Sequence, residues 1–235
     1  MNFDEVFSYK NLYRSYRKCL KGVRWKGTVQ RYEMTSLTNL YLTYEELRKG
    51  TLETGKFYKF DIIERGKLRH IKSVGIKERV VQRCLCDYCL VPRLSKEFVY
   101  DNYACLKDKG YHFAIKRVRY FLIKYYRKHH TNEGYILQYD LHHYFDTIPH
   151  DELIKKVSLL VDDEDLLKLY IQLVTDFEGD RGIGLGSQIS QISALFYPNE
   201  IDHHFKGIKE LDDYGRYMDD GLMISPSKEL LRKCL

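Results

Sequence analysis

The sequence predicts a mixed α/β (α+β) fold, in which helices are combined with short antiparallel strands. Apolar side chains recur at three- and four-residue steps in the first fifty residues, which is typical of helices. Apolar and polar residues alternate over 56–64 and 68–74, as they do in strands. Two further short strand segments, within 135–140 and 214–224, carry aspartates. At 235 residues, 44% of them hydrophobic, the chain is long enough to bury a sizeable core.

Glycine and proline indicate where these elements end. Gly50 supplies a stop after one helix, residues 65–67 (RGK) resemble a hairpin turn, and Pro92 marks the end of a later helix. In chain order, the expected elements are helices at 11–20 and 38–49, strands at 56–64 and 68–74, helices at 77–90 and 111–128, a strand at 135–140, and two short strands within 214–224.

The composition argues against membrane-spanning and secreted proteins. No run approaches the roughly 18 apolar residues of a membrane span, and the N-terminus has no apolar stretch like that of a signal peptide. We therefore expect a cytoplasmic protein with reduced thiols and no membrane partner. Cys84, Cys86 and Cys89 are close enough to suggest a metal knuckle, but no second Cys/His pair follows, so helical periodicity favours core cysteines.

Charge is divided unevenly along the chain. Residues 1–130 carry 29 Lys and Arg against 13 Asp and Glu, a balance of +16, whereas residues 131–235 carry 10 against 20, a balance of −10. This division suggests a polyanion held by the first part and metal-binding carboxylates in the second. Two ordinary solvated surfaces of opposite sign would give the same numbers, so charge alone does not decide between them.

Three aspartates stand at the ends of short apolar segments. Asp140 ends the strand at 135–140, and Asp219 and Asp220 lie at the tip of the hairpin within 214–224. Carboxylates in an apolar hairpin are costly unless their charge is compensated, and a divalent cation compensates it. Two such ions about 4 Å apart suit in-line nucleotidyl transfer. The alternative is an exposed Asp-Gly turn and a helix cap, an arrangement that is common for each segment alone.

These aspartates and the residues around them resemble the motifs of a known family. Residues 140–146 (DLHHYFD) resemble motif A of reverse transcriptases, 217–220 (YMDD) resemble motif C, and 182–191 (GIGLGSQISQ) resemble motif B. Residues 79–82 (RVVQ) and 100–112 (YDNYACLKDKGYH) resemble the finger motifs of the bacterial enzymes. The resemblance covers about residues 50–225, with the motifs in the family's order and spacing.

The sequence of motif B points to one branch of the family. Most relatives have Gln-Gly where this chain has Leu185-Gly186, and an aliphatic residue there, with Ser-Gln ending the motif, resembles the diversity-generating retroelement branch. One departure is Gly184, where relatives usually have proline, and we expect it to loosen the turn.

The resemblance implies a role for each matching residue. Asp140, Asp219 and Asp220 would be catalytic and would hold two Mg²⁺ ions, with Mn²⁺ as an alternative and the backbone carbonyl of Leu141 completing a coordination shell. Phe145, five residues after Asp140, would be the steric gate that selects deoxynucleotides. The remaining residues expected to bind nucleotide are Lys67 and Arg69 of the finger hairpin, and Leu185, Gly186 and Gln191 of motif B.

Several of these roles have plain structural alternatives. Phe145 is also readable as a core aromatic, and the spacing from Asp140 favours the gate. Lys67 and Arg69 are also readable as surface charges at a hairpin tip, with Arg69 the stronger functional candidate. The tyrosines and cations of 111–128 predict a basic, nucleic-acid-binding face, while most of the 21 tyrosines are expected to pack in the core.

The resemblance implies a polymerase right hand. We expect fingers over 1–134, with interleaved palm elements, and a palm over 135–235 formed by a small antiparallel sheet backed by helices. Relatives continue with a primer grip and a helical thumb, which this chain lacks, so we expect another segment or chain to complete it. The expected activity is RNA-directed DNA polymerisation (nucleotidyl transfer) by a low-fidelity retroelement enzyme, with an RNA template, a DNA or RNA primer, dNTPs and a small accessory protein as partners.

Three rival interpretations stay open. An RNA polymerase or primase would use ribonucleotides, whereas the YMDD sequence and Phe145 favour deoxynucleotides. A phage-defence, retron or group II intron enzyme would differ in its flanking domains and RNA partners. A truncated, inactive palm fragment would bind RNA without polymerising, and its RNA binding would survive the loss of Asp219.

Overall fold

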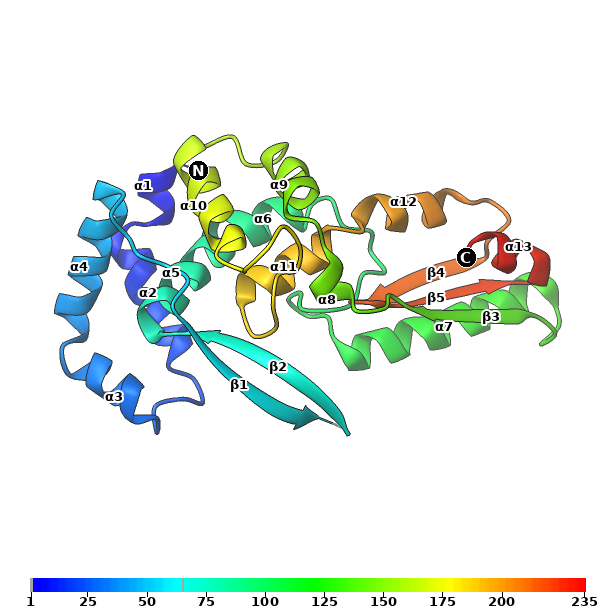
Figure 1. The fold of residues 1–235 in the computed structure, drawn as a ribbon. Helices are drawn as coiled ribbons and strands as arrows, with labels where there is room; N and C mark the ends of the chain where they lie inside the picture. Colours follow the sequence, from blue (N-terminus) through cyan, green and yellow to red (C-terminus); the bar gives the residue numbers. More distant parts are fainter. Residues whose placement is uncertain (1, 65) are drawn as a thin grey trace. The chain divides into compact units, whose positions relative to one another are not determined.

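A computed structural model describes residues 2–64 and 66–235, without the side chains of Glu64 and Lys67. The predicted mixed α/β class is confirmed, with small antiparallel sheets among helices (Figure 1). The elements are α1 (Phe3–Val6), α2 (Tyr9–Cys19), α3 (Gly27–Met34), α4 (Ser36–Lys49), β1 (Phe57–Glu64), β2 (Lys67–Val74), α5 (Ile76–Leu85), the π-helical turn η1 (Cys86–Leu90), α6 (Val91–Leu94), α7 (Tyr111–His129), β3 (Tyr135–Asp140), α8 (Tyr144–Thr147), α9 (His150–Ser158), α10 (Glu164–Thr175), α11 (Gln188–Phe196), α12 (Asn199–Gly207), β4 (Asp213–Tyr217), β5 (Asp220–Ser225) and α13 (Lys228–Lys233).

The chain forms two compact units, each built from two separate segments. The first unit combines Met1–Leu94 with Phe145–Ser193, and the second combines Ser95–Tyr144 with Ala194–Leu235. The second unit therefore contains the helix α7 and the whole three-stranded sheet. The expected assignment of fingers to 1–134 and palm to 135–235 concerns function rather than compactness and stays a prediction.

The first unit packs helices around a buried segment that runs from α5 through η1. Cys84, Cys86 and Cys89 are all fully buried there, as the core interpretation predicts. The prediction that Pro92 ends this helix is wrong, because the chain continues through the π-helical turn into α6. A proline has no N–H to donate to the preceding turn, and here the turn before it widens to π geometry instead of stopping.

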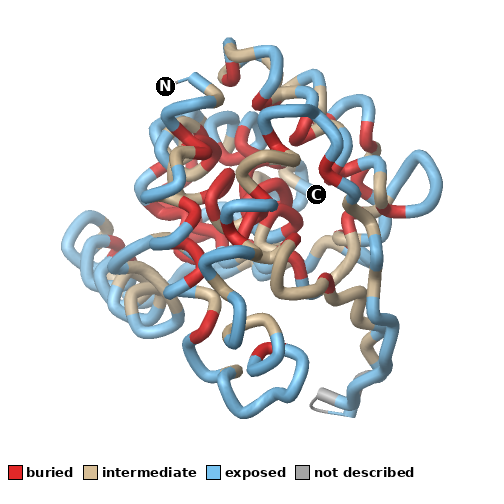
Figure 2. Tube along the Cα trace, turned by 90° about the vertical axis from the view of Figure 1, so that its left-hand side faces the viewer, coloured by how far each residue is buried: buried red, intermediate tan, exposed pale blue. Residues whose placement is uncertain are grey.

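The hairpin β1–β2 projects from the first unit. Its eight pairs run from Phe57 opposite Val74 to Glu64 opposite Lys67. Residues 58–63 are exposed along its outer length (Figure 2). The turn residue Arg65 and the side chain of Lys67 lie outside the described part of the structure, so the predicted role of Lys67 has no structural counterpart here.

The second unit contains an antiparallel sheet in the order β3-β5-β4. Alternate residues of β5 face opposite sides of this sheet. Met223 packs on one side with Tyr214 and Leu231, in a cluster that also includes residues of α12 and α13. Ile224 packs on the other side with Phe121 and Tyr125 of α7. The sheet is thus covered by α12 and α13 on one face and by α7 on the other. No helix of the described residues is long and apolar enough to cross a membrane.

Phe121 should be essential for holding α7 on the sheet. Its ring is fully buried against Ile224, so Phe121→Ala should lower the free energy of unfolding by about 3–5 kcal/mol through lost burial and the remaining cavity. The neighbouring Tyr120 is 51% exposed, so Tyr120→Ala provides a matched control with a change of well under that size. Urea unfolding of both variants measures the difference, and equal losses would contradict the packing described.

Candidate active site

Two of the predicted catalytic carboxylates lie directly opposite each other in the sheet. Asp140, the last residue of β3, pairs with Asp220, the first residue of β5. Residues paired in this way project from the same face of an antiparallel sheet, and like charges at such positions repel each other. Both residues are exposed, so a cation from solvent can reach them and offset that repulsion.

The third aspartate lies in the turn that joins β4 to β5. Tyr217 pairs with Asp220, which leaves Met218 and Asp219 as a two-residue tip. Met218 has φ +57°, and a positive φ at the first position alone fits a type II′ hairpin turn. The backbone N–H of Leu141 donates to the carbonyl of Asp219 at 3.2 Å. This hydrogen bond brings motif A and motif C together beyond the last sheet pair.

The three aspartates supply the ligand type that Mg²⁺ prefers. Carboxylate oxygens at the water-exposed end of the sheet suit an ion that keeps several of its waters. Among residues 2–64 and 66–235, however, no three His, Cys, Asp or Glu side chains are already gathered closely enough to hold a metal ion. Asp140 and Asp220 are opposed in the sheet and Asp219 is adjacent in the turn, so what fits a divalent ion here is the oxygen chemistry of the three carboxylates.

Arg216 of β4 supports the turn from inside the second unit. Its guanidinium is buried and donates to both carboxylate oxygens of Asp202 on α12, at 2.7 Å each. The same group donates to the carbonyl of Met218 at 2.6 Å and to that of Leu195 at 2.9 Å. Burial opposes the charge of Arg216, but the hydrogen bonds to Asp202 outweigh burial and raise its pKa.

Sequence reasoning did not single out this pair. An arginine between Gly215 and Tyr217 in an expected strand is the one available signal, because a buried guanidinium needs a partner. Asp202 also accepts a hydrogen bond from the Tyr214 hydroxyl at 2.6 Å, and that hydroxyl lies 2.9 Å from the Tyr139 hydroxyl of β3. Asp202 therefore connects motif C to the strand that carries motif A.

Apart from Leu141, the residues predicted to bind nucleotide belong to the first unit. The backbone N–H of Lys72 on β2 donates to the carbonyl of Leu185 at 3.2 Å. Gly186 has φ +109°, and a β-carbon there would press on Ile71 and the Lys72 carbonyl. Leu185 and Gly186 thus lie alongside β2, the strand that carries Arg69. Gln191 is exposed on α11.

The end of motif A and the residues just after it are hydrogen-bonded to the start of motif B. The carbonyl of Phe145 accepts from the N–H of Ile183 at 3.0 Å, and the carbonyl of Ile148 accepts from the N–H of Gly182 at 2.9 Å. The buried His150 adds a ring hydrogen bond to the Gly182 carbonyl at 2.6 Å. Phe145 itself is half-buried. It lies in the first unit, whereas Asp140, Leu141, Asp219 and Asp220 lie in the second.

Comparisons with known proteins decide the family. A family described as reverse transcriptase (RNA-dependent DNA polymerase) matches residues 59–235. The chain belongs to the reverse transcriptase family. Protein YkfC of Escherichia coli K12 is 25% identical to this chain over 147 residues, which are 59% of this chain and 38% of YkfC. A structure of apo telomerase from Candida tropicalis, truncated from its C-terminal domain, has a TM-score of 0.56 over 84% of this chain and 50% of that one, at 12% identity.

These similarities confirm the predicted fold and show how much of each relative the chain spans. The telomerase likeness, at low identity, supports a polymerase fold for a mixed α/β chain with small antiparallel sheets. This reverse transcriptase chain spans half or less of the length of YkfC and of that telomerase chain.

Gly184 differs from the expectation for this position of a reverse transcriptase. Instead of loosening the turn, it fits closely: its φ is +56°, and a β-carbon there would collide with the ring of Phe177. That ring stacks on Phe57 of β1 with centroids 4.9 Å apart. Proline, which fixes φ near −65°, cannot adopt this conformation. The glycine therefore allows motif B to approach the base of the hairpin.

Motif B is also connected to α5 by a buried polar chain. The Ser187 hydroxyl donates to Gln82 at 2.9 Å, and the Gln82 amide donates to Glu78 at 2.9 Å. The backbone N–H of Gly55 donates to the other oxygen of Glu78 at 3.2 Å. Burial, assisted by the negative charge of Asp176, raises the pKa of Glu78 to about 7.

This pKa shift predicts a pH-dependent stability. A carboxyl whose pKa rises from 4.5 to about 7 on folding stabilises the fold fully below pH ~4.5, and this contribution disappears as the pH rises through ~7. The size is on the order of 3 kcal/mol. Glu78→Gln should therefore show a smaller fall in the free energy of unfolding between pH 5 and pH 8 than the unmodified protein. Glu53→Gln, at an exposed carboxyl, is the control that should keep the original fall; equal falls in all three would contradict the assignment.

Proposed function

We propose that the chain is the catalytic part of an RNA-directed DNA polymerase that copies RNA into DNA by two-metal nucleotidyl transfer. The observation that carries this proposal is the opposition of Asp140 and Asp220 across the sheet, next to the turn that holds Asp219, in a chain of the reverse transcriptase family. Carboxylates at directly opposed positions repel each other, and a divalent cation bound at a phosphoryl-transfer site would offset that repulsion.

Different residues of the chain would bind the metal ions and the triphosphate. Asp140, Asp219 and Asp220 would hold Mg²⁺, with the Leu141 carbonyl as a further oxygen ligand. Bound Mg²⁺ supplies charge neutralisation at the primer 3′-hydroxyl and at the leaving pyrophosphate. Arg69 would hold the triphosphate with its fork of donors, and Lys67 is a weaker candidate for the same task.

The metal assignment predicts a clear loss of activity. In the full-length protein, Asp219→Asn should reduce primer extension on an RNA template by at least a thousandfold, because the amide cannot supply the negative charge that holds the ion. Asp151→Asn is the matched control, because Asp151 is an exposed residue on α9. Asp212→Asn would not serve, because Asp212 is buried and forms a salt bridge. Extension that survives Asp219→Asn would overturn the proposal. RNA binding by a protein that never extends a primer would favour an inactive RNA-binding module.

Sugar selection is proposed to depend on Phe145. A ring at this position would collide with a ribose 2′-hydroxyl and so favour deoxynucleotides. Phe145→Ala in the full-length protein should raise ribonucleotide incorporation relative to deoxynucleotide incorporation by at least tenfold in single-nucleotide extension. Phe3→Ala, at a half-buried ring of the same unit that packs on Phe7, should leave that ratio unchanged. Unchanged discrimination in Phe145→Ala would assign this ring to packing, and a wild-type preference for ribonucleotides would indicate an RNA polymerase or primase.

We further propose low fidelity, in the setting of a diversity-generating retroelement. Leu185 occupies the position of a glutamine in most relatives and has no side-chain donor or acceptor. A lost hydrogen bond is worth about 1 kcal/mol, and about 1.4 kcal/mol changes selection tenfold. The Leu185 carbonyl already serves the Lys72 N–H, so the side chain is the part that a substitution would test. In the competing view, Leu185 packs beneath the motif B helix and fidelity is set elsewhere.

The fidelity proposal is tested by restoring the glutamine. Leu185→Gln in the full-length protein should lower misincorporation opposite template bases by several-fold at comparable extension efficiency, measured by sequencing the products. Leu185→Met, which preserves an apolar side chain of similar volume, is the control that should keep the original error rate. Equal error rates in all three proteins would remove Leu185 as the cause and weaken the retroelement assignment.

A further inference from the structure

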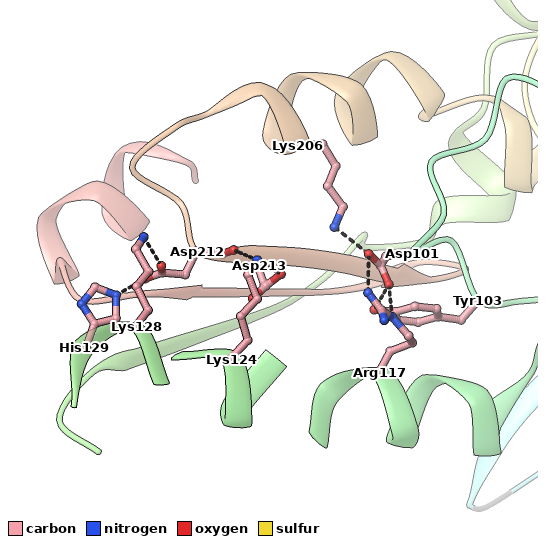
Figure 3. Close-up of polar contacts among 9 residues, drawn as sticks. All are labelled: Asp101, Tyr103, Arg117, Lys124, Lys128, His129, Lys206, Asp212 and Asp213. Carbon is pink, nitrogen blue, oxygen red and sulfur yellow. Dashed lines mark hydrogen bonds and ion pairs between the residues drawn. The ribbon is translucent and has the colours of Figure 1, made fainter. Parts of the chain in front are cut away.

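The cations of helix α7 fall into two sets, one paired with carboxylates and one exposed without an ion pair among the described residues. Each member of the first set contacts a buried carboxylate elsewhere in the second unit (Figure 3). Arg117 contacts Asp101, with Nε to Oδ1 at 2.6 Å, and Lys124 contacts Asp213 at 3.0 Å. Lys128 and His129 both contact Asp212, at 2.6 and 3.0 Å. These ion pairs hold α7 against the sheet and against the loop that precedes α7.

The second set points away from these carboxylates. Lys116, Arg119 and Arg127 are exposed and make no ion pair with any part of the chain that the structure describes. On a helical projection at 100° per residue they centre on the side opposite the buried Phe121 and Tyr125, and the paired Arg117, Lys124 and Lys128 lie on one flank between. No aspartate or glutamate occurs between Asp108 and Glu133. The outward face of α7 therefore carries an uncompensated positive charge.

Aromatic side chains accompany these cations. Tyr120 and Tyr126 are 51% and 52% exposed, and Tyr111 at the start of the helix is 66% exposed. Rings beside free Lys and Arg are suited to nucleic acid, since the cations contact phosphates and the rings contact sugars or bases. We define the outward face by Lys116, Arg119, Tyr120, Tyr126 and Arg127.

The outward face belongs to the helix that covers the catalytic side of the sheet. Asp220, Leu222 and Ile224 alternate along β5 and so share one face, and Leu222 and Ile224 contact α7. Asp140 lies on that face as well, because it pairs with Asp220. Helix α7 therefore lies on the same side of the sheet as the two opposed carboxylates.

Helix α7 also runs away from the catalytic end of the sheet. Arg117, near its start, binds Asp101, whose carbonyl accepts from the N–H of Arg216 close to the hairpin tip, at 2.9 Å. Lys128, near its end, binds Asp212, which precedes the far end of β4. From Lys116 to Arg127 the helix rises about 16 Å, a length that covers several phosphates of a duplex leaving the active site.

We propose that the outward face of α7 binds the sugar–phosphate backbone of the template–product duplex next to the active site. The inference rests on the proposed polymerase function, because that function is what supplies a duplex at Asp140 and Asp220. It goes beyond that function by assigning a binding surface to residues outside motifs A, B and C. The free cations set the affinity, and the paired cations fix the helix that presents them.

The test measures affinity for a labelled RNA–DNA hybrid by fluorescence anisotropy, with full-length protein, without divalent ions and at 50 to 200 mM salt. The triple variant Lys116→Ala/Arg119→Ala/Arg127→Ala should bind at least tenfold more weakly at 100 mM salt. Its plot of log affinity against log salt should be shallower by about 2 to 3, since each phosphate contact contributes about 0.9 to the slope. Replacing each cation by the other kind (Lys116→Arg/Arg119→Lys/Arg127→Lys) should retain most of the affinity.

The matched control removes three cations from the helices on the opposite face of the sheet and the adjoining loop. Lys209, Arg232 and Lys233 are exposed residues of the same unit, and their triple alanine variant should weaken binding by less than threefold. Circular dichroism and thermal unfolding should show that both triple variants are folded. Equal weakening by the two triple variants would reduce the effect to net charge and overturn the proposal. Unchanged binding by the α7 variant would also overturn it and would favour an acidic protein as the occupant of this face.

Failure of this proposal can be distinguished from failure of the proposed function. Asp219→Asn should abolish primer extension and leave hybrid affinity within threefold of the unmodified protein. If the α7 variant loses affinity while the unmodified protein extends no primer, the surface stands and the polymerase assignment fails. If the unmodified protein extends primers and the α7 variant binds as well as it does, the polymerase assignment stands and the surface fails.

Discussion

The buried pair of Arg216 and Asp202 is the interaction on which the second unit depends. A guanidinium removed from water is tolerated only where its donors are satisfied, and here they bind a carboxylate on α12 and the carbonyls of Met218 and Leu195. The backbone of Arg216 adds hydrogen bonds to Asp101 and Tyr103. One residue therefore connects a helix, a loop and the motif C turn, and the strained left-handed conformation of Met218 is held by this connection.

The position of the carboxylates that we propose to be catalytic follows from this arrangement. Because the turn is held from behind, β5 begins at Asp220, and its register places that residue opposite Asp140. The sheet thus brings together two charges that repel each other. Motif B is positioned separately, in the other compact unit, by Gly184 against Phe177 and by the chain of hydrogen bonds from Ser187 to Glu78.

The sequence predicted those features that depend on local patterns. The strand ending at Asp140, the hairpin around Asp219 and the helix α7 follow from alternation and helical periodicity, and the structure has them at nearly the expected bounds. Partners that are distant in sequence could not be predicted in the same way. The pairing of Arg216 with Asp202 depends on how α12 packs, and the division of the α7 cations depends on Asp101, Asp212 and Asp213. The prediction that Pro92 ends a helix failed because the π-helical turn before it lets the helical chain continue.

The central claim is that Asp140, Asp219 and Asp220 form one divalent-ion site, and metal-soaked crystals of the full-length protein test it most directly. Mn²⁺ replaces Mg²⁺ at oxygen sites and is located by its anomalous scattering. The account predicts Mn²⁺ density in contact with the carboxylates of Asp140 and Asp219, with Asp220 adjacent, and its loss in Asp219→Asn. Carboxylates of Asp140 and Asp219 more than about 10 Å apart would contradict it, because ions with ligand distances near 2 Å could not bridge them, as would Mn²⁺ bound only elsewhere.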